Sequence, residues 1–251
     1  TLHSLSDNEK VLLGSLSSVA VMRTFNSIPR SMPRISEGAW PSLVMPLDSF
    51  SRLLNQLNKN GSRPDFLVIE VNEYPEGRFD IRLDVLEAKW RSDGPQLKHL
   101  ISMHKDQCMS FIDEMRMWFS IDGDDSRRMS GIIFVSELIT AAIKLRESSS
   151  SDLDFSGEKG VSKSLSITDA LLKKKVNLSF GTNPMLICVS GDEAVVANTL
   201  IESEEFTGCV GVMRQCDAIR SLKDPCFQPT WYFKQGGLGS DEPLCSPPLK
   251  P

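Results

Sequence analysis

The sequence predicts an α/β fold in which helices flank a mixed sheet and a smaller α/β part follows at the C-terminal end. Hydrophobic residues make up 40% and charged residues 24% of the 251 residues, which is typical of a chain with a substantial core. Segments with helical and with strand periodicity alternate along the chain. Residues 63–91 hold two strand-like runs around a turn, and this hairpin organises the rest of the prediction.

The first sixty residues predict two helices and one short strand. Small polar residues precede an apolar-periodic run, so we expect a helix at about residues 7–25. Three prolines mark a loop at 26–41, before a short strand at 42–46. Asp48 then caps a second helix, which ends near Gly61.

The central hairpin has the clearest pattern. Residues 65–73 and 78–90 are rich in branched and aromatic side chains, and Pro75-Glu76-Gly77 between them is typical of a turn. We therefore expect two antiparallel strands. A charged set shares one parity of the second strand, which predicts that it forms the exposed face. These residues are Asp80, Arg82 and Asp84.

Helices and a polar segment follow the hairpin. Apolar residues at helical spacing predict helices at about residues 95–119 and 126–146. Residues 147–163 are rich in Ser, Asp and Gly, which predicts a flexible linker or an exposed loop. Shorter elements and an irregular tail at 224–251 complete the prediction. The short elements are helices at about 167–175 and 192–202 and strands at about 177–180, 185–190 and 208–213.

Composition excludes several classes of function. The formal net charge of -5 argues against a protein that coats nucleic acid, which is usually basic. Six cysteines form no CxxC pair, and with three histidines they show no zinc-ligand spacing, so we expect reduced thiols and a cytoplasmic protein. No apolar run approaches the length of a membrane span. Dinucleotide-binding and nucleophile-elbow motifs are also missing, which leaves a small-molecule enzyme without support.

The two ends of the hairpin carry a set of residues suited to phosphodiester hydrolysis. Asp65 stands at the start of the first strand, and Glu87 and Lys89 leave the same face of the second. Two carboxylates can hold Mg²⁺ or Mn²⁺, and the metal would lower the pKa of a bound water. Lys89 would orient or help deprotonate the attacking water and balance charge on the phosphate.

A simpler interpretation is that Glu87 and Lys89 line a solvated strand edge while Asp65 only begins a strand. The local sequence VLEAKW argues against it, because unpaired charge in an apolar run is costly. We therefore expect both side chains to have partners.

Pro64-Asp65 followed by Glu87-Ala88-Lys89 resembles the motif of the PD-(D/E)XK nuclease superfamily, the fold of many restriction enzymes and RecB-type exonucleases. The resemblance covers roughly residues 40–120. It implies a restriction-endonuclease-like sheet, Mg²⁺ or Mn²⁺ on Asp65 and Glu87, a catalytic Lys89, and DNA as substrate.

The resemblance also implies a glutamine in the following helix and an acidic residue before the hairpin. Gln107 stands four residues before Phe111, where the RecB-type branch has Gln-x-x-x-Tyr, and we favour it over Gln96. Glu9 and Asp48 are both candidates for the acidic residue. Glu70 is a candidate extra ligand, whereas we expect His99 and His104 to be surface or packing residues.

The domain organisation expected from this resemblance has four parts. Residues 1–147 form the nuclease-like core, and 148–163 a linker. Residues 164–223 form an α/β extension that completes or packs on the core, and 224–251 an irregular tail.

The order of elements around Pro46-Leu47-Asp48 further resembles nuclease-like regions attached to HerA/FtsK-type ATPases of bacterial restriction and phage-defence systems. This implies an ATPase or helicase domain or subunit as partner. It would lie outside these 251 residues, which contain no Walker motif. The absence of an initial Met and the Pro-rich end fit a piece of a longer protein. The alternative is a catalytically inactive nuclease-fold module that binds DNA or assembles a complex.

Overall fold

The fold comes from a computed structural model that describes most of the elements predicted above. The chain divides into two compact units that are interleaved in sequence. We call residues 30–85 and 107–182 the β1–β4 unit, and residues 1–29, 86–106 and 183–251 the β5–β7 unit. The described residues are 15–16, 19–22, 38–47, 64–91, 97–119, 125–149, 157–181, 185–190, 209–224, 227 and 231–235.

The β1–β4 unit contains a mixed sheet. Strand β1 (Leu43–Pro46) is antiparallel to β2 (Phe66–Glu73), which neighbours β3 (Phe79–Arg91). The first five residues of β3 are parallel to β4 (Val176–Phe180), with Phe79 opposite Val176. This confirms the predicted α/β class with a mixed sheet flanked by helices.

The turn between β2 and β3 fixes the register of the hairpin. Gly77 has a φ of +66°, which an L side chain rarely adopts, and its N–H donates to the Tyr74 carbonyl at 3.0 Å. The Tyr74 N–H donates to the Arg78 carbonyl at 2.9 Å, and the Arg78 guanidinium lies over the Tyr74 ring. Tyr74 and Arg78 are therefore the last cross-strand pair before the turn.

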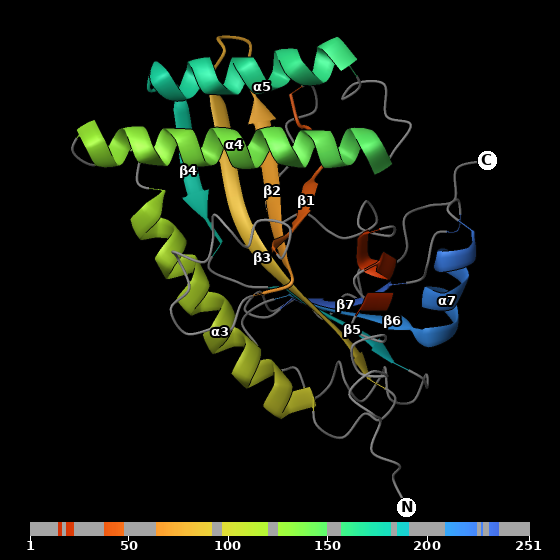
Figure 1. Ribbon diagram of the computed structural model, residues 1–251. Coiled ribbons are helices and arrows are strands. Elements are labelled where there is room, and N and C mark those ends of the chain that lie inside the picture. Colours follow the sequence, from red (N-terminus) through yellow and green to blue (C-terminus); the bar gives the residue numbers. More distant parts are fainter. Residues whose placement is uncertain are drawn as a thin grey trace, which may run out of the picture. The chain divides into compact units, whose positions relative to one another are not determined.

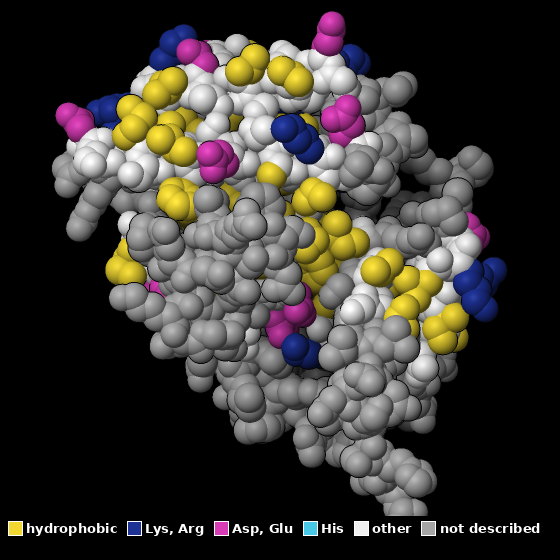
Figure 2. All heavy atoms as spheres, in the orientation of Figure 1, with side chains coloured by type: hydrophobic (Ala, Val, Ile, Leu, Met, Phe, Trp, Pro, Cys, Tyr) yellow, Lys and Arg dark blue, Asp and Glu magenta, His cyan; other side chains and the backbone are white. Residues whose placement is uncertain are grey.

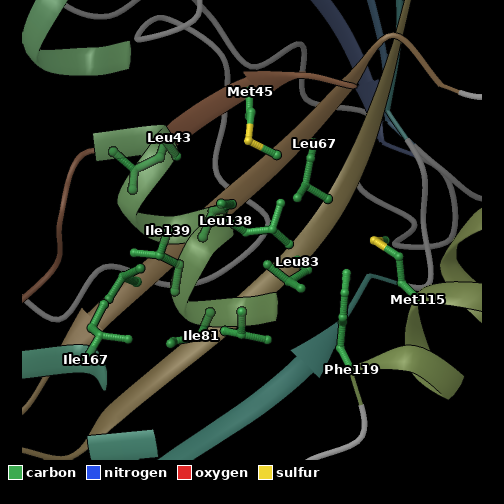
Figure 3. Close-up of a cluster of buried hydrophobic side chains, with 14 of the residues drawn as sticks. Leu43, Met45, Leu67, Ile81, Leu83, Met115, Phe119, Leu138, Ile139 and Ile167 are labelled. Atoms are coloured by element: carbon green, nitrogen blue, oxygen red, sulfur yellow. The ribbon is translucent and has the colours of Figure 1, made fainter. Parts of the chain in front are cut away.

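Three helices supply the other side of the core in this unit. Helices α4 (Asp125–Ser149) and α5 (Gly157–Leu172) lie side by side across the strands, and residues from 107 onward in α3 (Leu97–Trp118) join the same core (Figure 1). Figure 3 shows Ile81 and Leu83 of β3 facing Leu138 and Ile139 of α4. Alternate residues of β3 point into this core, as expected for a strand covered by helices.

The segment before β1 approaches β2 so closely that only glycine fits at position 38. The Glu73 N–H donates to the Gly38 carbonyl at 2.6 Å, and a Cβ on Gly38 would stand 1.7 Å from the Glu73 carbonyl oxygen. We expect Gly38→Ala to lower the free energy of unfolding by about 1–3 kcal/mol, because the main chain of β2 must shift. Urea unfolding of this variant would measure the loss. An unfolding free energy equal to that of the parent would show that the close approach is unimportant.

The β5–β7 unit contains the end of β3 and three further strands. Residues 86–91 of β3 are parallel to β5 (Met185–Ser190), which is parallel to β6 (Cys209–Arg214). Strand β7 (Trp231–Gln235) is antiparallel to β6 and follows helix α7 (Gln215–Lys223).

Three predictions about this part of the chain and the linker are wrong. Residues 157–163 belong to α5 and are not part of a linker, and Gly160 among them is buried. Residues 231–235 form β7 within the segment predicted to be an irregular tail. Helix α7 stands where no element was expected. The helix expected at 192–202 and that after Asp48 lie outside the described residues.

Most of the other predicted elements are confirmed. The two strands of the hairpin, the long helices α3 and α4, and strands β1, β4, β5 and β6 lie within a few residues of their expected bounds. Of the predicted first helix, the structure describes residues 15–16 and 19–22, which are helical. Among the helices of the described part, none has the length and apolar character needed to cross a membrane.

Candidate functional site

Asp65 occupies the bend that leads into β2. Its main-chain carbonyl accepts a hydrogen bond of 3.0 Å from the Leu47 N–H, which ties the end of β1 to the start of β2. The side chain of Asp65 is half-buried, and the preceding Pro64 is buried. The main chain of Asp65 is therefore tied to β1 at the beginning of β2.

Glu87 and Lys89 form an ion pair near the end of β3. The Lys89 Nζ lies 2.5 Å from the Glu87 Oε1, and Glu87 is only 2% exposed. Residues two apart on a strand share a face, so the pairing follows from the local geometry. The expectation that both charges have partners is confirmed.

The strand neighbours of this pair exclude the simpler interpretation of a solvated edge. Glu87 lies opposite Leu186 and Lys89 opposite Cys188 in the parallel pairing with β5. Burying a carboxylate inside a sheet costs desolvation free energy. The attraction of the Lys89 ammonium offsets part of this cost. The ammonium itself belongs to a side chain that is 28% exposed, so it can still reach solvent or a ligand.

Gln107 lies on α3 and is half-buried. Four residues later, Phe111 is 2% exposed and belongs to the core of the β1–β4 unit. The aromatic residue of the predicted Gln-x-x-x-Phe pattern is therefore a packing residue. The structure describes each unit by itself: Asp65 and Gln107 belong to the β1–β4 unit, and Glu87 and Lys89 to the β5–β7 unit.

Several predicted residues lie outside the described part of the chain. Glu9, Asp48 and Gln96 are among them. His99 and His104 belong to α3, but their side chains are likewise outside the description. Glu70 is described and is 2% exposed within β2.

A second group of buried charges, which the sequence did not predict, lies on the other face of the hairpin. Asp84 is 3% exposed, which overturns the prediction that Asp80, Arg82 and Asp84 form an exposed face; the other two are half-buried. The Arg82 Nε lies 3.5 Å from the Asp84 Oδ2, and the charge of Glu70 acts on Asp84 from β2. Successive side chains along a strand point to opposite faces of the sheet, so Glu70 and Asp65 lie on opposite faces. Glu70 therefore lies on the same face as Asp84.

Glycine at position 181 makes room for the Asp84 carboxyl. A Cβ on Gly181 would stand 2.1 Å from the Asp84 Oδ1, and the Gly181 N–H donates to the Leu83 carbonyl at 2.7 Å. The end of β4 therefore covers Asp84, which explains why a charged position of β3 is buried. The sequence signal for this was a glycine directly after a strand, which marks close approach of the backbone.

Burial raises the pKa of Asp84 to about 6. The negative charge of Glu70 adds to this shift, while Arg82 and the Val85 N–H, which donates to Asp84 at 3.1 Å, oppose it. The folded state thus holds this proton more tightly than the unfolded chain, in which an aspartate has a pKa of about 3.9. The contribution of Asp84 to stability is therefore present in full below about pH 4 and is lost as the pH rises through about 6.

We expect Asp84→Asn to remove this pH dependence. Between pH 4 and 7 the variant should gain stability relative to the parent, by up to roughly 3 kcal/mol, because the buried charge no longer forms. Urea unfolding at pH 4, 5, 6 and 7 measures the difference. Asp125→Asn, at an exposed position of α4, is the control. A difference between Asp84→Asn and the parent that is the same at every pH would contradict the assignment.

The donor set at the ends of the hairpin fits a hard divalent cation. Carboxylate oxygens are the ligands that Mg²⁺ and Mn²⁺ prefer, and no sulfur or imidazole is required. Asp65 offers such oxygens in the β1–β4 unit and Glu87 in the β5–β7 unit. Within the described residues no three Asp, Glu, His or Cys side chains gather as a metal site.

Comparisons with protein-family models, with curated proteins and with solved structures gave no match to this chain.

Proposed function

We propose that this chain is a metal-dependent nuclease domain that hydrolyses phosphodiester bonds of DNA. Asp65 and Glu87 hold Mg²⁺ or Mn²⁺, Lys89 acts on the attacking water and the phosphate, and Gln107 helps to position the reacting groups. The resemblance to PD-(D/E)XK nucleases on Pro64-Asp65 and Glu87-Ala88-Lys89 supports this assignment.

The buried ion pair of Glu87 and Lys89 carries the proposal. Glu87 is 2% exposed, and its Oε1 lies 2.5 Å from the Lys89 Nζ. Asp65 is half-buried at the beginning of β2, the strand that neighbours β3. We propose that the two carboxylates bind one cation. The two residues belong to different units, so their proximity is part of the proposal and is tested with it.

The contacts and exposure of Lys89 support its proposed role. Its ammonium contacts Glu87 while the side chain remains partly exposed. A cation beside the ligand carboxylate can attract the phosphate of a DNA strand and stabilise the charge that develops on it during attack by water. The same ammonium can orient that water by hydrogen bonding, since it carries three donors.

Gln107 and the partner complete the proposed machinery. The half-buried side-chain amide of Gln107 on α3 can exchange hydrogen bonds with water or phosphate, whereas Phe111 packs in the core.

The resemblance to regions attached to HerA/FtsK-type ATPases supports a role in a bacterial restriction or phage-defence complex. The partner would then be an ATPase or helicase domain or subunit.

Plasmid and linear DNA, in single-stranded and duplex form, test this function directly. With Mg²⁺ or Mn²⁺ the chain should convert at least one of these substrates to shorter products, and EDTA should stop the reaction. DNA that is bound but never cleaved under these conditions would contradict the proposal and favour an inactive nuclease-fold module.

A further inference from the structure

The outer surface of α4 and α5 carries a row of large apolar side chains. They are between 48% and 63% exposed, although most apolar residues of these helices are buried. We call them the apolar row: Met129, Ile133, Val161, Leu165 and Leu172. Figure 2 shows apolar side chains gathered on this side of the two helices. Apolar surface that continues across neighbouring elements commonly marks an interaction site.

The row flanks the line along which α4 and α5 pack, and we call this strip of surface the groove. Ser136 and Thr168 share a hydrogen bond of 2.6 Å between their hydroxyl groups, and Thr140 and Ser164 share another one helical turn further along. These short side chains bring α4 and α5 close together in antiparallel orientation. Residues four positions apart lie on one face of a helix, and bulkier side chains therefore project beside the hydroxyl contacts.

One end of the groove opens into a hollow with an acidic lining. Val161 and Leu165 form its apolar part, and three carboxylates surround them. The carboxylates belong to Glu147, Glu158 and Asp169, and among the described residues neither Lys nor Arg lines the hollow. Two of the three have local partners: Glu147 accepts a hydrogen bond from the Gly157 N–H at 2.7 Å, and Asp169 pairs with Lys173.

We infer that the groove between α4 and α5 is a docking site for a basic amphipathic helix of a partner protein. The apolar face of such a helix would cover the apolar row, and its lysine or arginine side chains would meet Glu158 and its neighbours at the hollow. A helix in a groove is recognised through anchors at three- and four-residue spacing, and opposite charge at the rim sets the orientation. This inference does not depend on the proposed nuclease activity.

A second copy of the chain fits the same surface less well. Two copies meeting at the hollow would bring both sets of three carboxylates together, and each chain has a formal net charge of -5. Like charges across an interface suppress association. The observations therefore favour a partner of opposite charge.

A pair of synthetic peptides can test the docking site. The first is a fluorescent helical peptide of about 16 residues, the length of α5, with leucine on one face and lysine elsewhere. The second has glutamate in place of every lysine. Fluorescence anisotropy with the whole chain should show binding of the lysine peptide and not of the glutamate peptide. Leu165→Ser and Glu158→Lys should each weaken that binding at least about fivefold, which is typical for residues that carry binding energy.

Two controls separate this site from non-specific attraction. Met117→Ser removes a side chain that is 70% exposed on α3, and Glu76→Lys makes the same charge change at the exposed β2–β3 turn. Neither should alter binding more than twofold or so. Equal losses in the control and test variants, or failure of the lysine peptide to bind, would overturn the inference. So would a concentration-dependent dimer in sedimentation experiments that Leu165→Ser abolishes, because the occupant would then be a second copy.

Discussion

Replacing Glu87 by Gln should lower metal-dependent cleavage of DNA by at least about a hundredfold. The substitution keeps the size of the side chain and removes the charge that faces Lys89 and that we propose holds the cation. A metal contributes several kcal/mol to stabilising charge in such a reaction, and each 1.36 kcal/mol corresponds to about tenfold in rate. Initial rates at saturating Mg²⁺ measure the loss.

Two further variants make that result interpretable. Glu76→Gln makes the same change at the exposed turn of the hairpin and should leave the rate unchanged. Glu87→Gln leaves Lys89 without its carboxylate partner, which can lower stability, so circular dichroism should confirm that the variant is folded. Asp65→Asn removes the other proposed ligand from a half-buried position and should cause a comparable loss of rate. Cleavage at the parental rate by both folded variants would contradict the assigned roles.

Truncating Leu83 to alanine should lower the free energy of unfolding by about 2–5 kcal/mol. Leu83 is fully buried in β3 and faces α4 in the core of the β1–β4 unit (Figure 3). Its removal forfeits transfer free energy and leaves a cavity that the surrounding side chains fill only in part. Denaturant unfolding measures the change.

Leu165→Ala supplies the matched control for this substitution. The same side chain is removed from a position of α5 that is 63% exposed, where little apolar surface is lost from the core. The free energy of unfolding should change by less than about 0.5 kcal/mol. Similar losses for the two leucine variants would show that β3 does not form the centre of the core.

The central hairpin could be predicted from the sequence because every local signal agreed. Its strands are rich in branched and aromatic residues, and Gly77 supplies the left-handed conformation that the turn requires. The pairing of Glu87 with Lys89 was likewise predictable, because charge within an apolar run needs a partner. These conclusions depend on neighbours in sequence, which periodicity describes well.

The missed features depend on neighbours that are distant in sequence. The first two turns of α5 are polar and rich in glycine, and their helical structure is favoured by packing against α4 that sequence periodicity does not reveal. Asp84 belongs to the charged positions that alternate with apolar residues along β3, a pattern typical of a solvent-facing side chain. The end of β4 at Gly181 nevertheless covers it. Strand β7 follows a segment rich in proline, and its pairing with β6 is a tertiary contact.

The elements that carry the candidate residues were predictable, whereas the site itself stays a prediction. Asp65, Glu87, Lys89 and Gln107 stand on the elements where they were expected. The choice between Glu9 and Asp48 falls outside the described residues. A metal site that combines the first residue of one strand with the last residues of the next depends on the register of the two strands. That register depends on the type of turn between them, which the sequence alone does not specify.

Binding of Mn²⁺ to the intact chain, followed by electron paramagnetic resonance, tests the central claim most directly. The parent should remove free Mn²⁺ from solution, with one or two ions bound per chain. Asp65→Asn and Glu87→Gln should each weaken that binding at least about tenfold, equivalent to 1.4 kcal/mol. Parental affinity in both folded variants, or no binding by the parent, would contradict the metal site on which the proposed nuclease function depends.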